Sequence, residues 1–362
     1  MKITMMTRWN APCGVSVHAE LIGRALAELG HEIRVLAPAE PEEILIGKDE
    51  PWVERCYTAN FFVPPGSKTA ERRFFNPEPF LRDFPDIFIV QNLEKHPMEE
   101  LYKDISRIKE NSKTVLVIHE GKMPENRLFY RFDWDAIVCF DEHYMRMLED
   151  AYPQEKIKII AYPCHPYHPG DKNEAKERLN LPDDKKTIFN FGPAVHNHIH
   201  ILPTLRRINE NIPIVFLTLT YSNDWYELFE ALKAKYKFID LRKGPVPLNI
   251  LYTYLHASDC LLLHKGPSEG MVVSSTVFLC FGAGIPILCY DTNFFKGLDR
   301  EVLKYGSLEG ERGLKKLLED VFEGKENVTS VPKAAREFVE YNSAYRITKR
   351  FTELFEDLLE RG

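Results

Sequence analysis

The sequence lacks any run of eighteen apolar residues, the usual signature of a membrane-spanning helix. Residues 1–6 begin a strand rather than a charged and then apolar signal segment, so we expect a cytoplasmic protein. No pair among the seven cysteines has Cys-x-x-Cys spacing, which indicates reduced core residues rather than disulfides or a metal site. A net charge of −7 with interleaved signs gives no basic surface for nucleic acid.

Several motifs of enzymes that use cofactors are also missing. Only Gly14 follows the first expected strand, where a nicotinamide or flavin enzyme would carry Gly-x-Gly-x-x-Gly. The chain has no nucleophile elbow, no Walker loop and no metal-carboxylate loop, so we expect neither a cofactor nor a metal. The scarcity of glutamine, limited to Gln91 and Gln154, is a hint of a thermophilic source.

The apolar runs that are present predict an α/β protein. A chain of 362 residues is long enough for two domains. Short, nearly continuous apolar runs alternate with helical patterns, as parallel strands covered on both faces do. The expected strands are residues 3–6, 33–37, 87–90, 114–118 and 136–140, and then 187–191, 214–217, 237–239, 260–263 and 286–289.

Three prolines within seven residues, Pro163, Pro166 and Pro169, resist both helix and central strand and mark the domain boundary. We therefore predict doubly wound, Rossmann-like domains at residues 1–162 and 172–335, a linker at 163–171 and a terminal helical segment at 336–362. Two such domains in tandem would leave a cleft between them.

Three segments of the chain contain residues that together form a recognisable set of motifs. The first is residues 7–18, with Gly14 before a helix, followed by Gly30, His31, Glu32 and Ile33. In the second, His119 ends an expected strand and precedes Glu120 and Gly121. The third is a loop of Gly266, Pro267, Ser268, Glu269, Gly270 and Met271 after the strand at 260–263, where open α/β sheets bind ligands.

These segments resemble the GT-B glycosyltransferases, specifically the retaining family 4, over most of the chain. The resemblance implies two Rossmann-like domains facing across a cleft, the first on the acceptor side and the second on the side of a nucleotide-sugar donor. It also implies that the terminal helix returns to the first domain, where Phe351 and Phe355 would support the hinge.

The same resemblance implies the site residues. His119 would hydrogen-bond the sugar and stabilise the transition state, and Glu269 would bind sugar hydroxyls, so both are expected to be catalytic. Arg8 and Trp9 would lie on the acceptor side, and the nucleoside near Pro245, Val246 and Pro247. The expected donor-binding residues are Gly14, Lys265, Ser268, Gly270, Met271, Val272, Ser274, Ser275 and His196.

Three departures from the family pattern affect the donor. Val277 stands where the family has a second glutamate for the ribose, and the interval to Gly284 is two residues longer than usual. The family's diphosphate-binding arginine and lysine are replaced by residues 193–200, which are rich in histidine. Lys265, His264 and Arg8 are candidate replacement cations, because a diphosphate leaving group needs compensating charge when no metal is bound.

Other patterns have simpler interpretations. His196, His198 and His200 would share a face on an extended strand, as in a zinc site, but no acidic or cysteine partner lies nearby. Surface histidines are the simplest interpretation, with phosphate contact as the alternative. The aromatic and basic residues 61–63 and 68–75 either pack on their own domain or form an interfacial patch, which would place the protein peripherally at the inner membrane face.

We therefore predict an enzyme that transfers a sugar from a nucleotide-sugar to a hydroxyl of a glycan, lipid or small molecule, with retention of configuration. Two alternatives stay open. One is a catalytically silent GT-B protein that binds a sugar nucleotide or glycan. The other is an epimerase that changes the sugar of a nucleotide-sugar without an acceptor.

Overall fold

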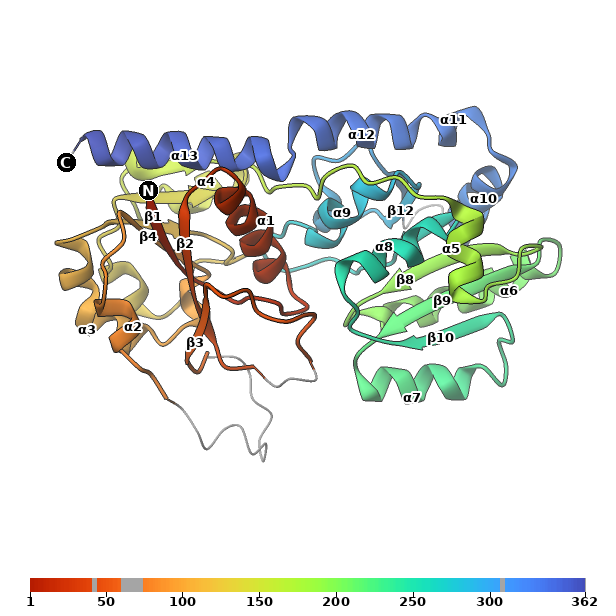
Figure 1. Ribbon diagram of the computed structural model, residues 1–362. Coiled ribbons are helices and arrows are strands. Elements are labelled where there is room, and N and C mark those ends of the chain that lie inside the picture. Colours follow the sequence, from red (N-terminus) through yellow and green to blue (C-terminus); the bar gives the residue numbers. More distant parts are fainter. Residues whose placement is uncertain (41–43, 60–73, 307–309, 362) are drawn as a thin grey trace. The chain divides into compact units, whose positions relative to one another are not determined.

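The computed structural model describes residues 1–40, 44–59, 74–306 and 310–361. The chain forms two compact units, each built on a parallel sheet (Figure 1). The first unit comprises Met1–Pro163, Gly270–Ser275 and Asn342–Gly362, and the second comprises Cys164–Glu269 and Thr276–Tyr341. The predicted α/β class with two doubly wound sheets is confirmed.

The sheet of the first unit has, within the described residues, seven strands in the order β3-β2-β1-β4-β5-β6-β7. Its central strands are buried along their length, as in Ile87, Phe88, Ile89 and Val90, which explains their continuous apolar sequences. The strands are β1 (Lys2–Met6), β2 (Glu32–Pro38), β3 (Val53–Tyr57), β4 (Ile87–Gln91), β5 (Lys113–Val117), β6 (Ala136–Cys139) and β7 (Ile157–Ile159).

The α-helices of this unit include the last one in the chain, α13, which packs beside α1 (Figure 1). Ser343 caps α13 by accepting a hydrogen bond from Arg346 N, and Phe351 and Phe355 are buried. The helices are α1 (Gly14–Glu28), α2 (Glu78–Leu81), α3 (Met98–Lys109), α4 (Glu142–Leu148) and α13 (Ala344–Glu360). The proposed hinge role of Phe351 and Phe355 stays a prediction.

The sheet of the second unit has six strands in its described part, in the order β10-β9-β8-β11-β12-β13. The strand expected at 237–239 begins at Ile239, where it pairs with Phe216, because Tyr236 and Phe238 pack their rings ahead of it. The strands are β8 (Lys186–Phe191), β9 (Ile214–Thr220), β10 (Ile239–Lys243), β11 (Cys260–Leu263), β12 (Ile287–Tyr290) and β13 (Leu303–Tyr305).

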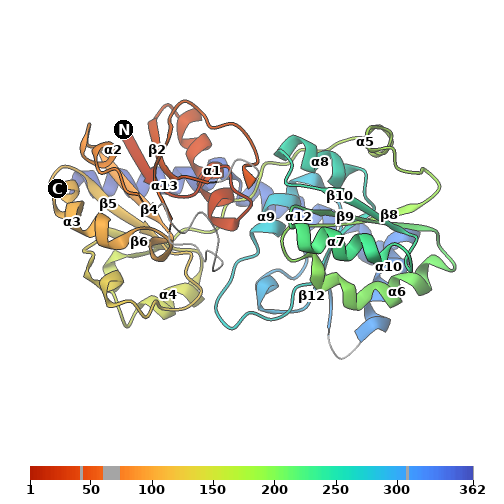
Figure 2. The same ribbon diagram turned by 90° about the horizontal axis from the view of Figure 1, so that it is seen from below.

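Helices cover both faces of this second sheet, and Figure 2 shows them from below. On one face α5 (Lys172–Leu179), α8 (Leu248–His256), α9 (Ser275–Cys280) and α12 (Val331–Tyr341) close one apolar core. On the other face a second core is closed by α6 (Leu202–Asn209), α7 (Asn223–Leu232), α10 (Gly310–Glu323) and α11 (Glu326–Thr329). Polar chemistry is thereby restricted to the strand ends and loops.

Two further findings concern membranes. No helix in the described part of the chain combines the length and apolarity needed to cross a bilayer. Most of the aromatic and basic segment predicted as an interfacial patch, residues 60–73, lies outside the described residues. Phe74 is exposed, and the ring of Phe75 packs on Phe80 with 4.9 Å between centroids. Contact with a membrane therefore stays a prediction.

Candidate functional site

The candidate site of the first unit lies at the carboxyl ends of β4 and β5. Parallel strands present their loops and chemistry at this edge. The β4 strand ends at Gln91, and the apolar run of β5 continues through Ile118 to the half-buried His119. The two neighbouring strands thus bring a carboxamide and an imidazole together.

The imidazole of His119 is held from several sides. Its Nε2 lies 3.2 Å from Gln91 Oε1, and its ring meets the rings of His18 and Phe140 at 5.1 and 5.0 Å between centroids. Burial, together with nearby His18 and His96, lowers the pKa of His119 well below its ordinary value. His119 is therefore a neutral hydrogen-bonding group at pH 7 rather than a cation.

Glu120 follows His119 and is a buried carboxyl that sequence reasoning did not select. Its oxygens accept hydrogen bonds from the backbone N–H groups of Glu94 and His119, at 3.1 and 3.0 Å. Burial nevertheless raises the pKa of Glu120 to about 7. A group that changes charge near neutral pH thus adjoins His119.

The segment Gly270–Ser275, which includes the last two residues of the predicted loop Gly266–Met271, belongs to the first unit. Met271 N donates a hydrogen bond of 2.7 Å to Gly121 O, two residues after His119. A side chain at Gly121 would place its Cβ 2.3 Å from Met271 O, and one at Gly270 would lie 2.6 Å from Gly121 O. Glycine is therefore required on both sides of this backbone crossing.

Gly14, the first residue of α1, makes a second contact with this segment. A Cβ at Gly14 would lie 2.9 Å from Ser275 Oγ, while Gly14 O accepts a hydrogen bond of 2.7 Å from the hydroxyl of Tyr162. The absence of a side chain at Gly14 thus lets Ser275 approach its backbone closely, whereas the predicted contact of Gly14 with a donor stays a prediction. The structure thus brings Gly14, Gly270, Met271 and Ser275 together with the strand end that carries His119.

The predicted acceptor-side residues are committed to protein contacts. Trp9 is completely buried, and its indole N–H donates to Glu50 Oε2 at 2.7 Å. Trp9 is thus a core residue and presents no surface to a substrate. The Arg8 guanidinium forms a bidentate pair with Glu40, at 2.6 and 2.9 Å, so its charge is already compensated.

Lys265 is the remaining candidate cation, at the carboxyl end of β11 in the second unit. Its Nζ donates to Thr276 Oγ1 at 3.2 Å and lies 5.3 Å from the ring centroid of Phe294. Burial lowers the pKa of Lys265 to about 8, so the ammonium form persists at pH 7. A half-buried cation on a loop of this kind is suited to a phosphate.

His264 lacks this charge. Its Nδ1 lies 2.8 Å from Tyr305 Oη, its ring packs on Tyr290 at 4.8 Å, and burial lowers the pKa of His264 to about 4. It is therefore neutral at pH 7 and does not serve as a replacement cation.

The loop after Lys265 is fixed through Ser268. Asn293 Oδ1 accepts from Ser268 N, and Asn293 Nδ2 donates to Ser268 O, both at 2.9 Å. The adjacent Glu269 is exposed. Asn293 was not found from the sequence because it lies on a separate loop after β12, without a motif of its own.

The helix after this loop is α9. The α9 helix begins at Ser275, so the backbone amides of Gly270, Met271 and Val272 precede it. Ser274 is buried just before the helix. Val277, at the position of the family's second glutamate, is also fully buried and packs in the apolar core, where an ionised carboxyl would be costly.

The three alternating histidines lie on a 3₁₀ helix, Val195–Ile201, rather than on a strand. His196 stacks on Trp225 at 4.2 Å between centroids, whereas His198 is buried and hydrogen-bonds backbone carbonyls. Across the described residues, no three His, Cys, Asp or Glu side chains gather as metal ligands would. The segment 193–200 contains no arginine or lysine, and contact of His196 with a phosphate stays a prediction.

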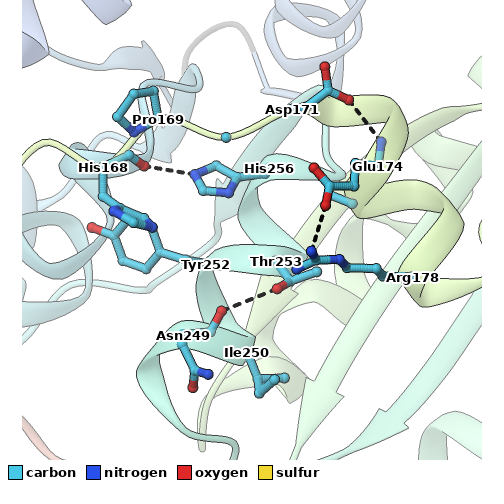
Figure 3. Close-up of a pocket in the computed structure, with 12 residues that line it drawn as sticks. His168, Pro169, Asp171, Glu174, Arg178, Asn249, Ile250, Tyr252, Thr253 and His256 are labelled. Carbon is cyan, nitrogen blue, oxygen red and sulfur yellow. Dashed lines mark hydrogen bonds and ion pairs between the residues drawn. The ribbon is translucent and has the colours of Figure 1, made fainter.

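A separate pocket of about 280 Å³ lies between α5 and α8 (Figure 3). Its polar groups face one another: Glu174 pairs with Arg178 at 2.5 Å, and His256 Nε2 lies 2.8 Å from His168 O. The lining residues that the structure describes include none of the predicted site residues. We therefore place the candidate site at the strand ends and not in this pocket.

Solved structures of glycosyltransferases share this fold along the whole chain. A glycosyltransferase from Rickettsia africae ESF-5 matches with a TM-score of 0.71 and 13% identity, covering 100% of this chain and 99% of that one. For a sucrose-phosphate synthase from Thermosynechococcus elongatus the TM-score is 0.70 and the identity 12%, with 100% of both chains covered. Anabaena HepE in complex with UDP and glucose matches with a TM-score of 0.69 and 12% identity, covering 99% of this chain and 100% of that one.

No protein-family model matches the sequence. The structural similarity establishes the fold, which is the GT-B fold that the sequence predicted. At identities this low it does not establish the reaction, which has to be argued from the residues.

The backbone crossing at Gly121 can be tested by adding one methyl group. In Gly121→Ala the new Cβ would overlap Met271 O. We therefore expect the free energy of unfolding to fall by about 1 to 3 kcal/mol, and the amide of Met271 to exchange at least about tenfold faster than in the wild type. Gly266→Ala is the control, because nothing lies within 4 Å of its Cβ position. Hydrogen exchange followed by mass spectrometry measures the exchange rate in both variants. Equal rates in the two variants would contradict the assigned contact.

The buried carboxyl of Glu120 predicts a pH-dependent stability. The pKa of Glu120 is about 7 in the folded protein and about 4.3 in an unfolded chain. Between these two pH values the unfolded chain loses its proton first, so the free energy of unfolding falls as pH rises. Relative to Glu120→Gln, the wild type should lose about 2 to 3 kcal/mol of unfolding free energy between pH 5 and pH 8. Urea unfolding measures the difference, with exposed Glu125→Gln as control. A difference that stays constant with pH would refute the assignment.

Proposed function

We propose that this protein transfers a sugar from a nucleotide-sugar to an acceptor hydroxyl, with retention of configuration. Support comes first from the fold, which matches glycosyltransferases over essentially the full length of both chains. The observation that carries the proposal is the placement of His119 and Lys265 with its loop at the carboxyl ends of β5 and β11. Ligands of open α/β sheets bind at these ends.

Each residue has a role suited to its environment. Lys265 would neutralise the diphosphate leaving group, because it is a cation at pH 7 whose burial strengthens its interaction with an anion. Glu269 is exposed and would accept hydrogen bonds from sugar hydroxyls. The neutral His119 would hydrogen-bond a substrate hydroxyl. Val272 would offer its backbone N–H group to the donor, whereas the N–H group of Met271 is already donated to Gly121 O.

The proposed chemistry needs positioning and electrostatic stabilisation more than a protein nucleophile. The bond from the anomeric carbon to the diphosphate oxygen breaks, and the acceptor oxygen forms the new bond on the same face of the sugar. The departing diphosphate oxygen can then take the proton of the acceptor hydroxyl. In this scheme Lys265 stabilises charge that develops on the leaving group, which is where electrostatic catalysis is most effective.

The family's second glutamate is absent, and Val277 takes its position in the core. A catalytically silent protein that binds a sugar nucleotide or glycan therefore remains the alternative. Incubation with UDP-sugars and a panel of sugar acceptors decides between the readings, because a transferase releases UDP and forms a glycoside. A silent protein would bind the donor without releasing UDP, and an epimerase would change the sugar without an acceptor. Nuclear magnetic resonance of the anomeric proton distinguishes these products and reports whether configuration is retained.

Two substitutions test the assigned residues in this assay. His119→Ala and Glu269→Ala should each lower kcat/KM by at least about a hundredfold, because each removes a group that positions or stabilises the reacting sugar. Glu177→Ala, an exposed carboxylate on α5, is the control and should transfer at the wild-type rate. Wild-type rates in both test variants would show that the site is assigned to the wrong residues.

Lys265 makes a separate prediction about binding. Lys265→Met should weaken UDP binding by about ten- to a hundredfold, the usual worth of a charge-assisted hydrogen bond, whereas exposed Lys296→Met should not. Because the pKa of Lys265 is about 8 before UDP binds, affinity should decline as pH rises above 8 and the lysine loses its proton. Calorimetric titration checks both effects. Unchanged affinity in Lys265→Met would remove this residue from the donor site.

A further inference from the structure

Gln91, the last residue of β4, meets three histidines that are distant from one another in sequence. Its Oε1 lies 2.8 Å from His18 Nδ1 and 3.2 Å from His119 Nε2. Its backbone oxygen lies 2.8 Å from His96 Nε2. Gln91 itself is 1% exposed, so its carboxamide has little access to water, and leaving its oxygen unpaired would be costly.

The chemistry of these atoms determines which imidazole nitrogens carry protons. An amide oxygen can only accept hydrogen bonds, and it has two lone pairs. Both imidazoles must therefore donate to Gln91 Oε1, which puts a proton on His18 Nδ1 and on His119 Nε2. The backbone oxygen of Gln91 fixes His96 in the same way, with a proton on Nε2, and His96 Nδ1 accepts from the hydroxyl of Tyr57 at 2.9 Å.

The assignment of these protons also agrees with the second ring nitrogen of His18, which is buried. His18 Nε2 has no hydrogen-bond partner among the described residues. With the proton on Nδ1, that unpaired atom is a lone pair rather than an N–H group, and buried orphan acceptors are less rare than orphan N–H donors. Reversing the Gln91 carboxamide would reverse the tautomers and bury an unpaired N–H at His18.

The surroundings hold this arrangement in place. The ring of His18 packs against Phe140, Tyr162 and Phe351, at 5.3, 5.2 and 6.1 Å between centroids, so it has little room to turn. Asn92, next to Gln91, adopts a left-handed backbone with φ of 60°, a conformation that asparagine tolerates, and Asn92 N donates to Val117 O at 3.1 Å. Gln91 is thereby fixed from both its side chain and its backbone.

We infer that Gln91 and His18 are positioning residues that hold His119 as its Nε2-protonated tautomer and leave His119 Nδ1 as a hydrogen-bond acceptor. The hydrogen bond from the His119 ring to Gln91 is made by Nε2, so Nδ1 can accept one from a ligand. The group that fits is a hydroxyl or another donor, and not a phosphate oxygen, which is an acceptor at neutral pH. The part of this inference that concerns transfer rests on the proposed function, whereas the tautomer does not.

The tautomer is tested directly by long-range ¹H–¹⁵N correlation spectra of the imidazoles in the ¹⁵N-histidine-labelled protein. We expect a protonated Nε2 and an unprotonated Nδ1 at His119, and the opposite pattern at His18. In Gln91→Met, which has no acceptor oxygen, the His119 signals should shift toward a mixture of both tautomers. Gln154→Met, at the only other glutamine in the chain and an exposed one, is the control.

Gln91→Glu is a second variant that keeps the shape of the side chain and both accepted hydrogen bonds. The new carboxylate would favour imidazolium, so it should raise the pKa of His119. The other titratable groups around it are His18 on α1, His96 after β4 and the adjacent Glu120, and the spectra resolve each histidine separately. Transfer should then fall as pH is lowered through the raised pKa, where His119 gains a proton on Nδ1 and stops accepting.

In the transfer assay Gln91→Met should lower kcat by between about tenfold and about a hundredfold, the usual cost of a misplaced group. A His119 that is charged or Nδ1-protonated at pH 7 in the wild type would overturn the inference. So would a Gln91→Met variant with unchanged His119 signals. If no donor supports transfer but the spectra show the expected tautomer and its loss in Gln91→Met, the positioning role is upheld and the proposed function fails.

Discussion

The hydrogen bond from Met271 N to Gly121 O is the contact on which the candidate site of the first unit depends. It exists because neither Gly121 nor Gly270 has a Cβ, so two backbones can cross at a distance that any side chain would prevent. The crossing places Gly270 and Met271 next to the strand end that carries His119. A loop that follows a strand of the second sheet thus becomes part of the first unit.

Burial then decides what each polar group can do. Of the three candidate cations, Arg8 is compensated by Glu40, and His264 is neutral and tied to Tyr305. Lys265 keeps its charge at pH 7 although burial lowers its pKa. In the first unit, burial makes His119 neutral, so its contribution lies in hydrogen-bond geometry, and the carboxamide of Gln91 sets that geometry.

The sequence was sufficient for the fold class and for part of the site. Continuous apolar runs identified the central buried strands, whereas β3, β7 and β13 escaped notice. The β3 strand is only partly buried, and β7 and β13 have three residues each. His119 and Lys265 were selected as candidates because each follows a buried strand. Gln91 and Asn293 could not be found, because their partners are remote in sequence and meet them only after folding. Trp9 was misjudged because its position in a loop gives no sign that its ring is buried.

The central claim is that this chain binds a nucleotide-sugar through Lys265 and the loop that follows it. A crystal structure of the protein soaked with UDP tests this claim most directly. The account predicts the diphosphate within hydrogen-bond distance of Lys265 Nζ, with backbone N–H groups of the loop beside it. UDP bound elsewhere, such as in the pocket between α5 and α8, with no contact to Lys265, would contradict it.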